Sequence, residues 1–263
     1  MQKVKFGVIG CGSIAEIAHF PSIKEIPEAE LVAVCDTNEE TVKQVATKWK
    51  AKAYFTDYRE MLNKAEIEAV IIATPNSFHR EQTLAAAQAK VHVLVEKPLS
   101  NDVNEARDMV KKAREEGLYL ACNLNHYFTP PAEQADKYIQ EGKIGELIYC
   151  LHKMGFAGGE TTYSPQQSSR VKGFPYFHVK AFLSHPFSVM RHFCGDITHV
   201  QAFIDRPSFR KKAGDLMLSI NSIHVKFANG CIGYLLSQRG DATFGLGGWW
   251  SCLLYTSDAA DEL

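Results

Sequence analysis

Two glycines and an alanine near the N-terminus have the spacing of a phosphate-binding turn. Gly10, Gly12 and Ala15 follow the apolar run from Val4 to Ile9 in the pattern Gly-x-Gly-x-x-Ala. The run predicts a buried strand, and the small residues predict a tight turn that opens a helix. Gly10 permits the turn, Gly12 lacks the Cβ that would block a pyrophosphate, and Ala15 lets the helix pack close to the strand. We therefore expect a dinucleotide whose pyrophosphate binds backbone N–H groups in the first turn of the helix. The expected N–H donors are those of Ser13 and Ile14.

An acidic residue ends the next apolar run. Asp36 follows Leu31–Cys35 and lies 24 residues after Gly12, close to the roughly 20 residues that separate such glycines from a ribose-binding carboxylate. Its charge would repel a 2′-phosphate, and residues 37–40 contain no Arg or Lys, so we expect NAD rather than NADP. The alternative for Asp36 is an Asp that only ends a strand and starts a turn. The alternatives for the glycine pattern are an ordinary Gly-rich turn and a methyltransferase-type nucleotide loop.

Strand and helix patterns alternate through the first half of the chain. Strands that alternate with helices form parallel sheets with right-handed crossovers. We therefore predict an α/β fold with a doubly wound parallel sheet, an NAD-binding Rossmann domain, over residues 1–122. The expected strands span 4–9, 31–35, 53–55, 69–73, 91–95 and 118–122, and the expected helices begin at the capping box Thr37-Asn38-Glu39-Glu40 and near residues 57, 77 and 102.

Polar residues follow the fourth and fifth predicted strands. Thr74-Pro75-Asn76 comes after residues 69–73, and Glu96-Lys97-Pro98 comes after residues 91–95. Ligands bind at the carboxyl ends of strands in open α/β sheets, so both tripeptides are expected beside the dinucleotide. Lys97 could stabilise an alkoxide that develops during hydride transfer, and the bond before Pro98 is a candidate for a cis peptide. The alternative is that Glu96 and Lys97 form an exposed ion pair at the strand end.

The order of these motifs resembles one family of oxidoreductases. The glycine pattern, Ala73-Thr74-Pro75-Asn76 with His79, Glu96-Lys97-Pro98, and Glu141-Gly142-Lys143-Ile144-Gly145 occur in this order in the glucose–fructose oxidoreductase / inositol dehydrogenase (Gfo/Idh/MocA) family. The resemblance covers residues 1–250. It implies a nicotinamide-dependent oxidoreductase of sugars, polyols or related hydroxy compounds. It also implies a C-terminal substrate domain over residues 123–250, with an open, mostly antiparallel sheet through which a homo-oligomer forms.

The resemblance implies roles for individual residues as well. The matching lysine is catalytic in the family, so Lys97 is expected to act on the substrate, with Glu96 on the nicotinamide side. Thr74-Pro75-Asn76 would line the nicotinamide ribose, His79 would lie near the same pocket, and Asn125 matches a position near cofactor and substrate. A single His on a helix is more often structural, and this alternative stays open for His79.

The expected catalytic proton acceptor is His185. On the helix that faces the nicotinamide, the family commonly has an Asp four residues before the His and a further acidic residue after it. This chain has Ala181 and Ser188 at those two acidic positions. An Asp one turn away would raise the basicity of the imidazole, so His185 lacks its usual partner. The alternative function is a non-catalytic NAD- or sugar-binding regulatory protein on the same fold. The nearby substitutes for the base are His178 and Lys180.

The second half of the chain carries further helix and strand patterns. A hairpin turn is expected at Ala228-Asn229-Gly230, because Asn-Gly tolerates positive φ. Residues 251–263 resemble translated adapter sequence, so we expect a non-native tail on a truncated domain, with a short natural C-terminus as the alternative. The expected elements are helices over 131–140 and 179–193 and strands over 147–154, 198–204, 216–227 and 231–238.

Charge and cysteine content argue against several other classes of protein. The formal net charge of −1 gives no electrostatic footprint for nucleic acid. The seven cysteines contain no C-x-x-C pair, so we expect neither disulfides nor a metal site. Such cysteines are typical of a protein in a reducing cytoplasm, which is the expected location. The apolar run before Cys11 is too short for a signal segment, and no apolar stretch has the ~20 residues that cross a membrane. Among partners this leaves the small sugar or polyol that the resemblance implies.

Overall fold

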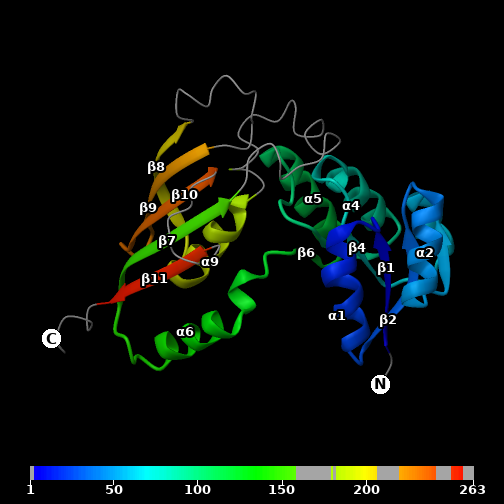
Figure 1. The fold of residues 1–263 in the computed structure, drawn as a ribbon, viewed down its shortest axis with the longest axis horizontal. Coiled ribbons are helices and arrows are strands. Elements are labelled where there is room, and N and C mark those ends of the chain that lie inside the picture. The colour runs from blue at the N-terminus through cyan, green and yellow to red at the C-terminus, as the bar shows by residue number, and fades with distance from the viewer. Residues whose placement is uncertain (1–2, 158–178, 180–181, 206–218, 241–249, 257–263) are drawn as a thin grey trace. The chain divides into compact units, whose positions relative to one another are not determined.

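The structure is a computed structural model that describes residues 3–157, 179, 182–205, 219–240 and 250–256 (Figure 1). The chain divides into two compact units, residues 1–123 and 124–263, and each unit contains its own sheet. The expected division after residue 122 falls next to this boundary.

The first unit contains a six-stranded parallel sheet, which confirms the predicted α/β fold. Its strand order is β3-β2-β1-β4-β5-β6, and every neighbouring pair is parallel. This is the order of a Rossmann fold, in which the winding reverses between β1 and β4. Ligands bind in the crevice at such a switch point, outside the carboxyl ends of the strands. The strands are β1 (Val4–Ile9), β2 (Ala29–Cys35), β3 (Ala53–Phe55), β4 (Ala69–Ile72), β5 (His92–Val95) and β6 (Leu120–Cys122).

Helices cover both faces of this sheet. Successive residues of a strand point to opposite faces, so Val8 packs with residues of α1 and α2, whereas Ile9 packs with residues of α3, α4 and α5. Because both faces are buried, the central strands consist almost entirely of apolar residues. The helices are a π-helical turn (Ala15–His19) that continues into α1 (Phe20–Glu25), then α2 (Glu39–Trp49), α3 (Tyr58–Lys64), α4 (His79–Gln88) and α5 (Val103–Glu115).

The start of α2 differs from the predicted capping box. Asn38 rather than Thr37 is the N-cap, and its Oδ1 accepts a hydrogen bond from Thr41 N at 2.9 Å. Asp36 Oδ1 in turn accepts a hydrogen bond from Asn38 N at 3.0 Å. The carboxylate at the end of β2 therefore shapes the turn that places Asn38, and not Thr37, at the cap.

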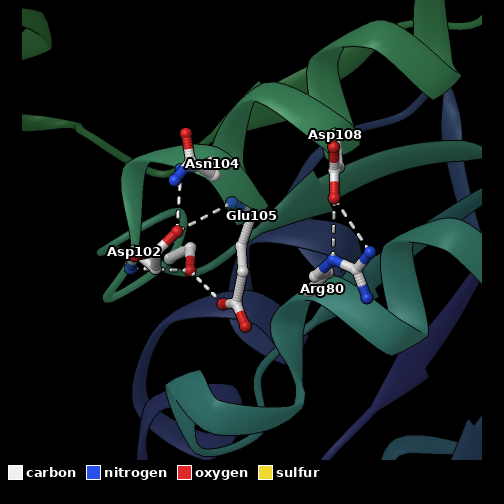
Figure 2. Close-up of polar contacts among 6 residues, drawn as sticks. Arg80, Asp102, Asn104, Glu105 and Asp108 are labelled. Carbon is white, nitrogen blue, oxygen red and sulfur yellow. Dashed lines mark hydrogen bonds and ion pairs between the residues drawn. The ribbon is translucent and has the colours of Figure 1, made fainter.

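The start of α5 is held by an aspartate cap, and its middle is tied to α4 (Figure 2). Asp102 Oδ1 accepts hydrogen bonds from Asn104 N at 2.8 Å and from Glu105 N at 3.2 Å. Further along the helix, Arg80 Nη2 of α4 donates to Asp108 Oδ2 at 2.8 Å. The cap satisfies two N–H groups that have no acceptor within the helix, whereas the ion pair lies at the surface.

Asp102→Ala is expected to lower the free energy of unfolding by about 1 kcal/mol, because the first turn of α5 loses its acceptor. Asp108→Ala is the matched control, since it removes a carboxylate of the same helix whose exposed ion pair contributes less than ~1 kcal/mol. Urea unfolding followed by circular dichroism measures both changes. An equal or larger loss in Asp108→Ala would contradict the cap assignment.

The second unit contains a five-stranded sheet that is mostly antiparallel, as expected. Its order is β11-β7-β10-β9-β8, in which only the β7–β10 pair is parallel among the described strands. The hairpin turn before Cys231 is confirmed: Gly230 has a φ of 93°, and Asn229 Oδ1 accepts a hydrogen bond from Cys231 N at 3.1 Å. The strands are β7 (Leu147–Ala157), β8 (Ile197–Asp205), β9 (Ser219–Phe227), β10 (Ile232–Gly240) and β11 (Trp250–Thr256).

Two α-helices are described in the second unit, α6 (Pro130–Gln140) and α9 (Ser184–Cys194). Met190 and Cys194 of α9 are buried in one cluster with Ile223, Val225 and Leu235 from the sheet. The helix therefore covers one face of this sheet and supplies much of the core of the unit.

The end of the described chain forms a strand that the sequence did not predict. Trp250–Thr256 is β11, which pairs antiparallel with β7 and includes residues 251–256 of the segment expected to be a non-native tail. Pairing satisfies the N–H and C=O groups that this edge of β7 would otherwise leave exposed. Residues 257–263 of the expected tail lie outside the described residues.

Candidate active site

The predicted tight turn is present at the end of β1. Gly10 has a φ of 95°, and a Cβ on this residue would lie 2.7 Å from the carbonyl oxygen of Ala73, just beyond β4. Only glycine fits here, because the backbone is left-handed and the end of β4 passes close by. At Gly12, by contrast, a Cβ would meet no described atom within 4 Å, so the surface above this residue is open to a ligand. Ala15 is fully buried, as close packing of the helix requires.

The helix begins directly after this turn, at Ser13. The N–H groups of its first turn have no acceptor one turn earlier in the helix. The side chains of Ser13 and Ile14 are exposed, so this end of the helix borders solvent. Open space at Gly12 and available N–H donors beside it fit the pyrophosphate of a dinucleotide.

Asp36 ties the end of β2 to the glycine turn. Its Oδ2 accepts a hydrogen bond from Cys11 N at 2.9 Å, while its Oδ1 accepts the one from Asn38 N. A carboxylate oxygen can accept more than one hydrogen bond, so both oxygens keep acceptor capacity for ribose hydroxyls. Asp36 therefore fits the expected ribose position and has a second role, because it holds the turn that would receive the pyrophosphate.

Polar side chains hold the loop after β4. Thr74 Oγ1 donates to Gln82 Oε1 at 2.6 Å, and Asn76 Nδ2 donates to Asn101 Oδ1 at 3.1 Å. Pro75 lies between them and is exposed. Because Asn101 follows β5, the contact made by Asn76 joins the loops beyond two neighbouring strands.

His79 joins the same two loops from below the surface. Its Nε2 lies 3.0 Å from Thr74 O, its Nδ1 lies 2.9 Å from Pro98 O, and the residue is 1% exposed. Burial lowers the pKa of His79, although the carbonyl contacts act in the opposite direction. The neutral ring has one N–H and donates to one carbonyl at a time. The structural alternative for His79 is supported, since both ring nitrogens face backbone carbonyls.

Glu96 is buried at the end of β5. It is 6% exposed, and its Oε1 lies 2.8 Å from His19 Nε2 and 2.7 Å from Asn123 Nδ2. Its Oε2 accepts a hydrogen bond from the backbone N of Lys97 at 3.2 Å. The alternative of an exposed Glu96–Lys97 ion pair is therefore wrong, because the carboxylate is buried and has other partners. The expected cis peptide bond is confirmed between Lys97 and Pro98.

The electrostatics of this pair of residues follow from burial and from these hydrogen bonds. Burial raises the pKa of Glu96, but the hydrogen bonds from His19 and Asn123 outweigh it and hold this pKa below its ordinary value. Burial lowers the pKa of the half-buried Lys97, and the negative charge of Glu96 opposes that change. The charge of the buried Glu96 carboxylate thus favours the protonated form of Lys97, the next residue along the chain.

Sequence reasoning missed two residues of this site, His19 and Asn123. The position of Asn123 beside Glu96 could have been inferred from strand register. β5 and β6 pair in parallel with Val95 opposite Cys122, and the residues that follow these two are Glu96 and Asn123. Strand ends in the same register bring their following side chains together. For His19 the pattern of the helix gave no comparable signal.

The second unit holds the remaining predicted residues. Asn125 is exposed and precedes the 3₁₀ turn His126–Phe128. His185 lies in the first turn of α9, is 8% exposed, and stacks on the ring of His126 with centroids 3.7 Å apart and planes at 6°. Ser188 Oγ donates to the backbone oxygen of His185 at 2.7 Å and thus supports the helix start. The positions of Ala181, His178 and Lys180 lie outside the described residues.

The described ranges contain neither a metal-binding cluster nor a membrane-spanning helix. There, no group of three or more His, Cys, Asp or Glu side chains could hold a metal ion. No helix within those ranges is long and apolar enough to span a bilayer. Six cysteines whose side chains the structure describes are not joined by disulfides: Cys11, Cys35, Cys122, Cys150, Cys194 and Cys231.

The sequence matches known oxidoreductases. Residues 4–124 match the family model GFO_IDH_MocA, described as an oxidoreductase family with an NAD-binding Rossmann fold. The chain is 32% identical to the D-glucoside 3-dehydrogenase of Escherichia coli (strain K12) over 161 residues, which are 60% of this chain but only 46% of that protein. It is 25% identical to the myo-inositol 2-dehydrogenase of Thermotoga maritima over 240 residues, which are 90% of this chain and 69% of that protein. The match to the glucoside dehydrogenase thus spans less than half of that protein.

The fold is shared with solved structures. An oxidoreductase from Agrobacterium radiobacter, crystallised with NAD+, L-tartaric acid and magnesium, has a TM-score of 0.84 to this chain at 20% sequence identity. The match covers 97% of this chain and 72% of the other. At this identity the likeness shows the fold alone.

Proposed function

We propose that this chain, whose residues 4–124 match the model of the Gfo/Idh/MocA family of NAD-binding oxidoreductases, is a member of that family and transfers a hydride between nicotinamide and a hydroxyl- or carbonyl-bearing carbon of a sugar, polyol or related compound. Relatives named as glucoside and inositol dehydrogenases support this substrate class. The observation that carries the proposal is the buried carboxylate of Glu96 next to the half-buried ammonium of Lys97, at the carboxyl end of β5.

Lys97 supplies positive charge in this proposal. Oxidation of a secondary alcohol needs a hydride acceptor, an acceptor for the hydroxyl proton, and donors for the developing alkoxide. Bound NAD would supply the hydride acceptor. The ammonium of Lys97 donates a hydrogen bond to the substrate oxygen, and the charge of Glu96 helps to keep Lys97 protonated despite its burial.

The proposed cofactor is NAD rather than NADP. Asp36 has acceptor capacity for both ribose hydroxyls, and its negative charge disfavours a 2′-phosphate at the same place. The residues proposed to hold the pyrophosphate lie at the glycine turn and are Gly10, Gly12, Ser13 and Ile14. The residues proposed on the nicotinamide side follow β4, β5 and β6 in the chain and are Thr74, Pro75, Asn76, His79, Glu96, Lys97 and Asn125.

His185 is the proposed proton acceptor. Imidazole is the side chain that exchanges protons most readily near neutral pH. The parallel stack with His126 fixes the plane of the His185 ring without a carboxylate one turn away. This arrangement supports a base whose ring is oriented by stacking, in a chain that has Ala181 where the family resemblance implies an Asp.

We also propose a homo-oligomer that forms through the sheet of the second unit, and a cytoplasmic location. Phe203, Ile220 and Ile232 lie on one face of this sheet and are exposed, which fits a surface that a second copy would cover. Six cysteines with described side chains that are not joined by disulfides fit a reducing compartment.

Single-turnover reduction of NAD across a panel of sugars and polyols tests the function. We expect His185→Gln to slow hydride transfer by about 10²-fold or more, because the proton acceptor is lost. His192→Gln is the matched control, since His192 lies on the same helix with its Nε2 2.7 Å from Asp136 Oδ2, and this variant should keep its rate. Compounds that bind but never exchange a hydride would favour the non-catalytic regulatory protein instead.

A further inference from the structure

A buried histidine from the dinucleotide-binding helix reaches the carboxylate beside Lys97. His19 is 6% exposed, as is Glu96, and their Nε2 and Oε1 atoms are 2.8 Å apart. His19 ends the π-helical turn that begins at Ala15. A π turn holds one more residue than an α-helical turn, so the next side chain is rotated by about 100°. That rotation allows His19 to face β5 from a helix that starts at the glycine turn.

We propose that His19 is a positioning residue, which holds the Glu96 carboxylate ionised and fixed beside Lys97 and so links the dinucleotide-binding helix to the catalytic lysine. The inference rests on the proposed function for the role of Lys97. It does not depend on which sugar or polyol is the substrate.

The hydrogen bonds of Glu96 give its carboxylate a single position. Nε2–H of His19 and Nδ2 of Asn123 donate to Oε1, and the backbone N–H of Lys97 donates to Oε2. These three donors come from the helix after β1, from the end of β6 and from the end of β5. A buried carboxylate remains ionised only when such donors offset the cost of burial. Removing His19 therefore removes one of the donors that keep Glu96 charged.

The same charge acts on neighbouring groups. Titratable groups of the first unit that interact electrostatically with Glu96 include His19, Lys97, His79 of α4 and Cys122 of β6. Burial raises the pKa of Cys122 to about 11, so its thiol stays neutral at neutral pH. Lys97 is therefore the cation on which the placement of the Glu96 charge has its main effect.

Two replacements of His19 separate positioning from packing. His19→Phe keeps a buried ring but removes the donor, and His19→Gln keeps a side-chain N–H that can reach the carboxylate. Carbon-13 NMR of protein labelled at the Glu carboxyl carbon, with Glu96→Gln to assign the signal, follows the titration of Glu96 without any need for turnover. We expect His19→Phe to move the Glu96 midpoint about one pH unit higher and His19→Gln to restore part of that shift.

Turnover provides the second measurement. In His19→Phe we expect kcat to fall about tenfold while KM for NAD stays within about twofold, and the acid limb of the kcat profile should move to higher pH with Glu96. If His19→Phe does not fold, Asn123→Ala removes the other side-chain donor to the same oxygen and should shift Glu96 in the same direction. An unchanged Glu96 midpoint in either folded variant overturns the proposal. A parent protein without turnover would instead contradict the proposed function, and the NMR titration would still decide the role of His19.

Discussion

Lys97→Ala is expected to lower the rate of hydride transfer by about 10²–10³-fold, because a donor aimed at the developing alkoxide contributes that much. NADH affinity should change little, since the glycine turn and Asp36 are not altered. Stopped-flow kinetics with the best substrate of the panel measure the rate, and NADH fluorescence measures the affinity. Lys90→Ala is the control, because it removes an exposed lysine that pairs with Glu116 in the same unit.

The pH dependence of the parent protein gives an independent check on Lys97. The ammonium is the active form, and burial places its pKa below the ordinary value of 10.5. Activity should therefore be lost as pH rises through this lowered pKa, at a pH below that of an ordinary lysine. An unchanged rate in Lys97→Ala would remove Lys97 from the mechanism, whatever the pH profile.

The parent protein is expected to bind NADH at least ten times more tightly than NADPH, because Asp36 would face the 2′-phosphate. Combining Asp36→Ser with Thr37→Arg should move the preference toward NADPH. Fluorescence titration with both cofactors measures the ratio of the two dissociation constants. Tighter binding of NADPH by the unmodified protein is the result that this assignment cannot accommodate.

Asp36→Asn is the matched control for this experiment. Asp36 also accepts a hydrogen bond from Cys11 N, so a change to Ser can loosen the glycine turn and weaken both cofactors together. Asn keeps a carbonyl oxygen for Cys11 N but has no negative charge. It should therefore relax discrimination against NADPH while retaining more of the NADH affinity than Asp36→Ser does.

The first unit was predictable because each of its strands is a short apolar run closed by turn residues. Parallel pairing and right-handed crossovers then bring the ends of β1, β4 and β5 to one edge, which is why the glycine turn and both tripeptides were placed correctly at strand ends. The hydrogen-bond partners of Glu96 were not predictable from local pattern. They depend on the π-helical turn that His19 ends and on tertiary packing, and neither feature gives a periodic pattern in the sequence.

Two other differences have similar causes. The N-cap of α2 is Asn38 rather than the predicted Thr37, because Asp36, which lies outside the helix, accepts a hydrogen bond from the backbone N–H of Asn38. The strand at residues 250–256 was not predicted, because the resemblance of residues 251–263 to translated adapter sequence excluded that segment from the expected fold. β11 pairs with the edge of β7 through backbone groups, which depend little on residue type.

The place of β7 in its sheet also determines when it can be shielded during synthesis. Both neighbours of β7, β10 and β11, follow it in the chain, and Tyr149 finds its partner only when Ile232 has been made. The six strands of the first unit, by contrast, all precede residue 123 and can pair while the ribosome is still translating the second unit. A nascent chain therefore carries β7 with neither of its final neighbours while residues 158–231 are added. During that interval the edges of this strand can pair with another chain, because an unpaired strand edge is a template for aggregation.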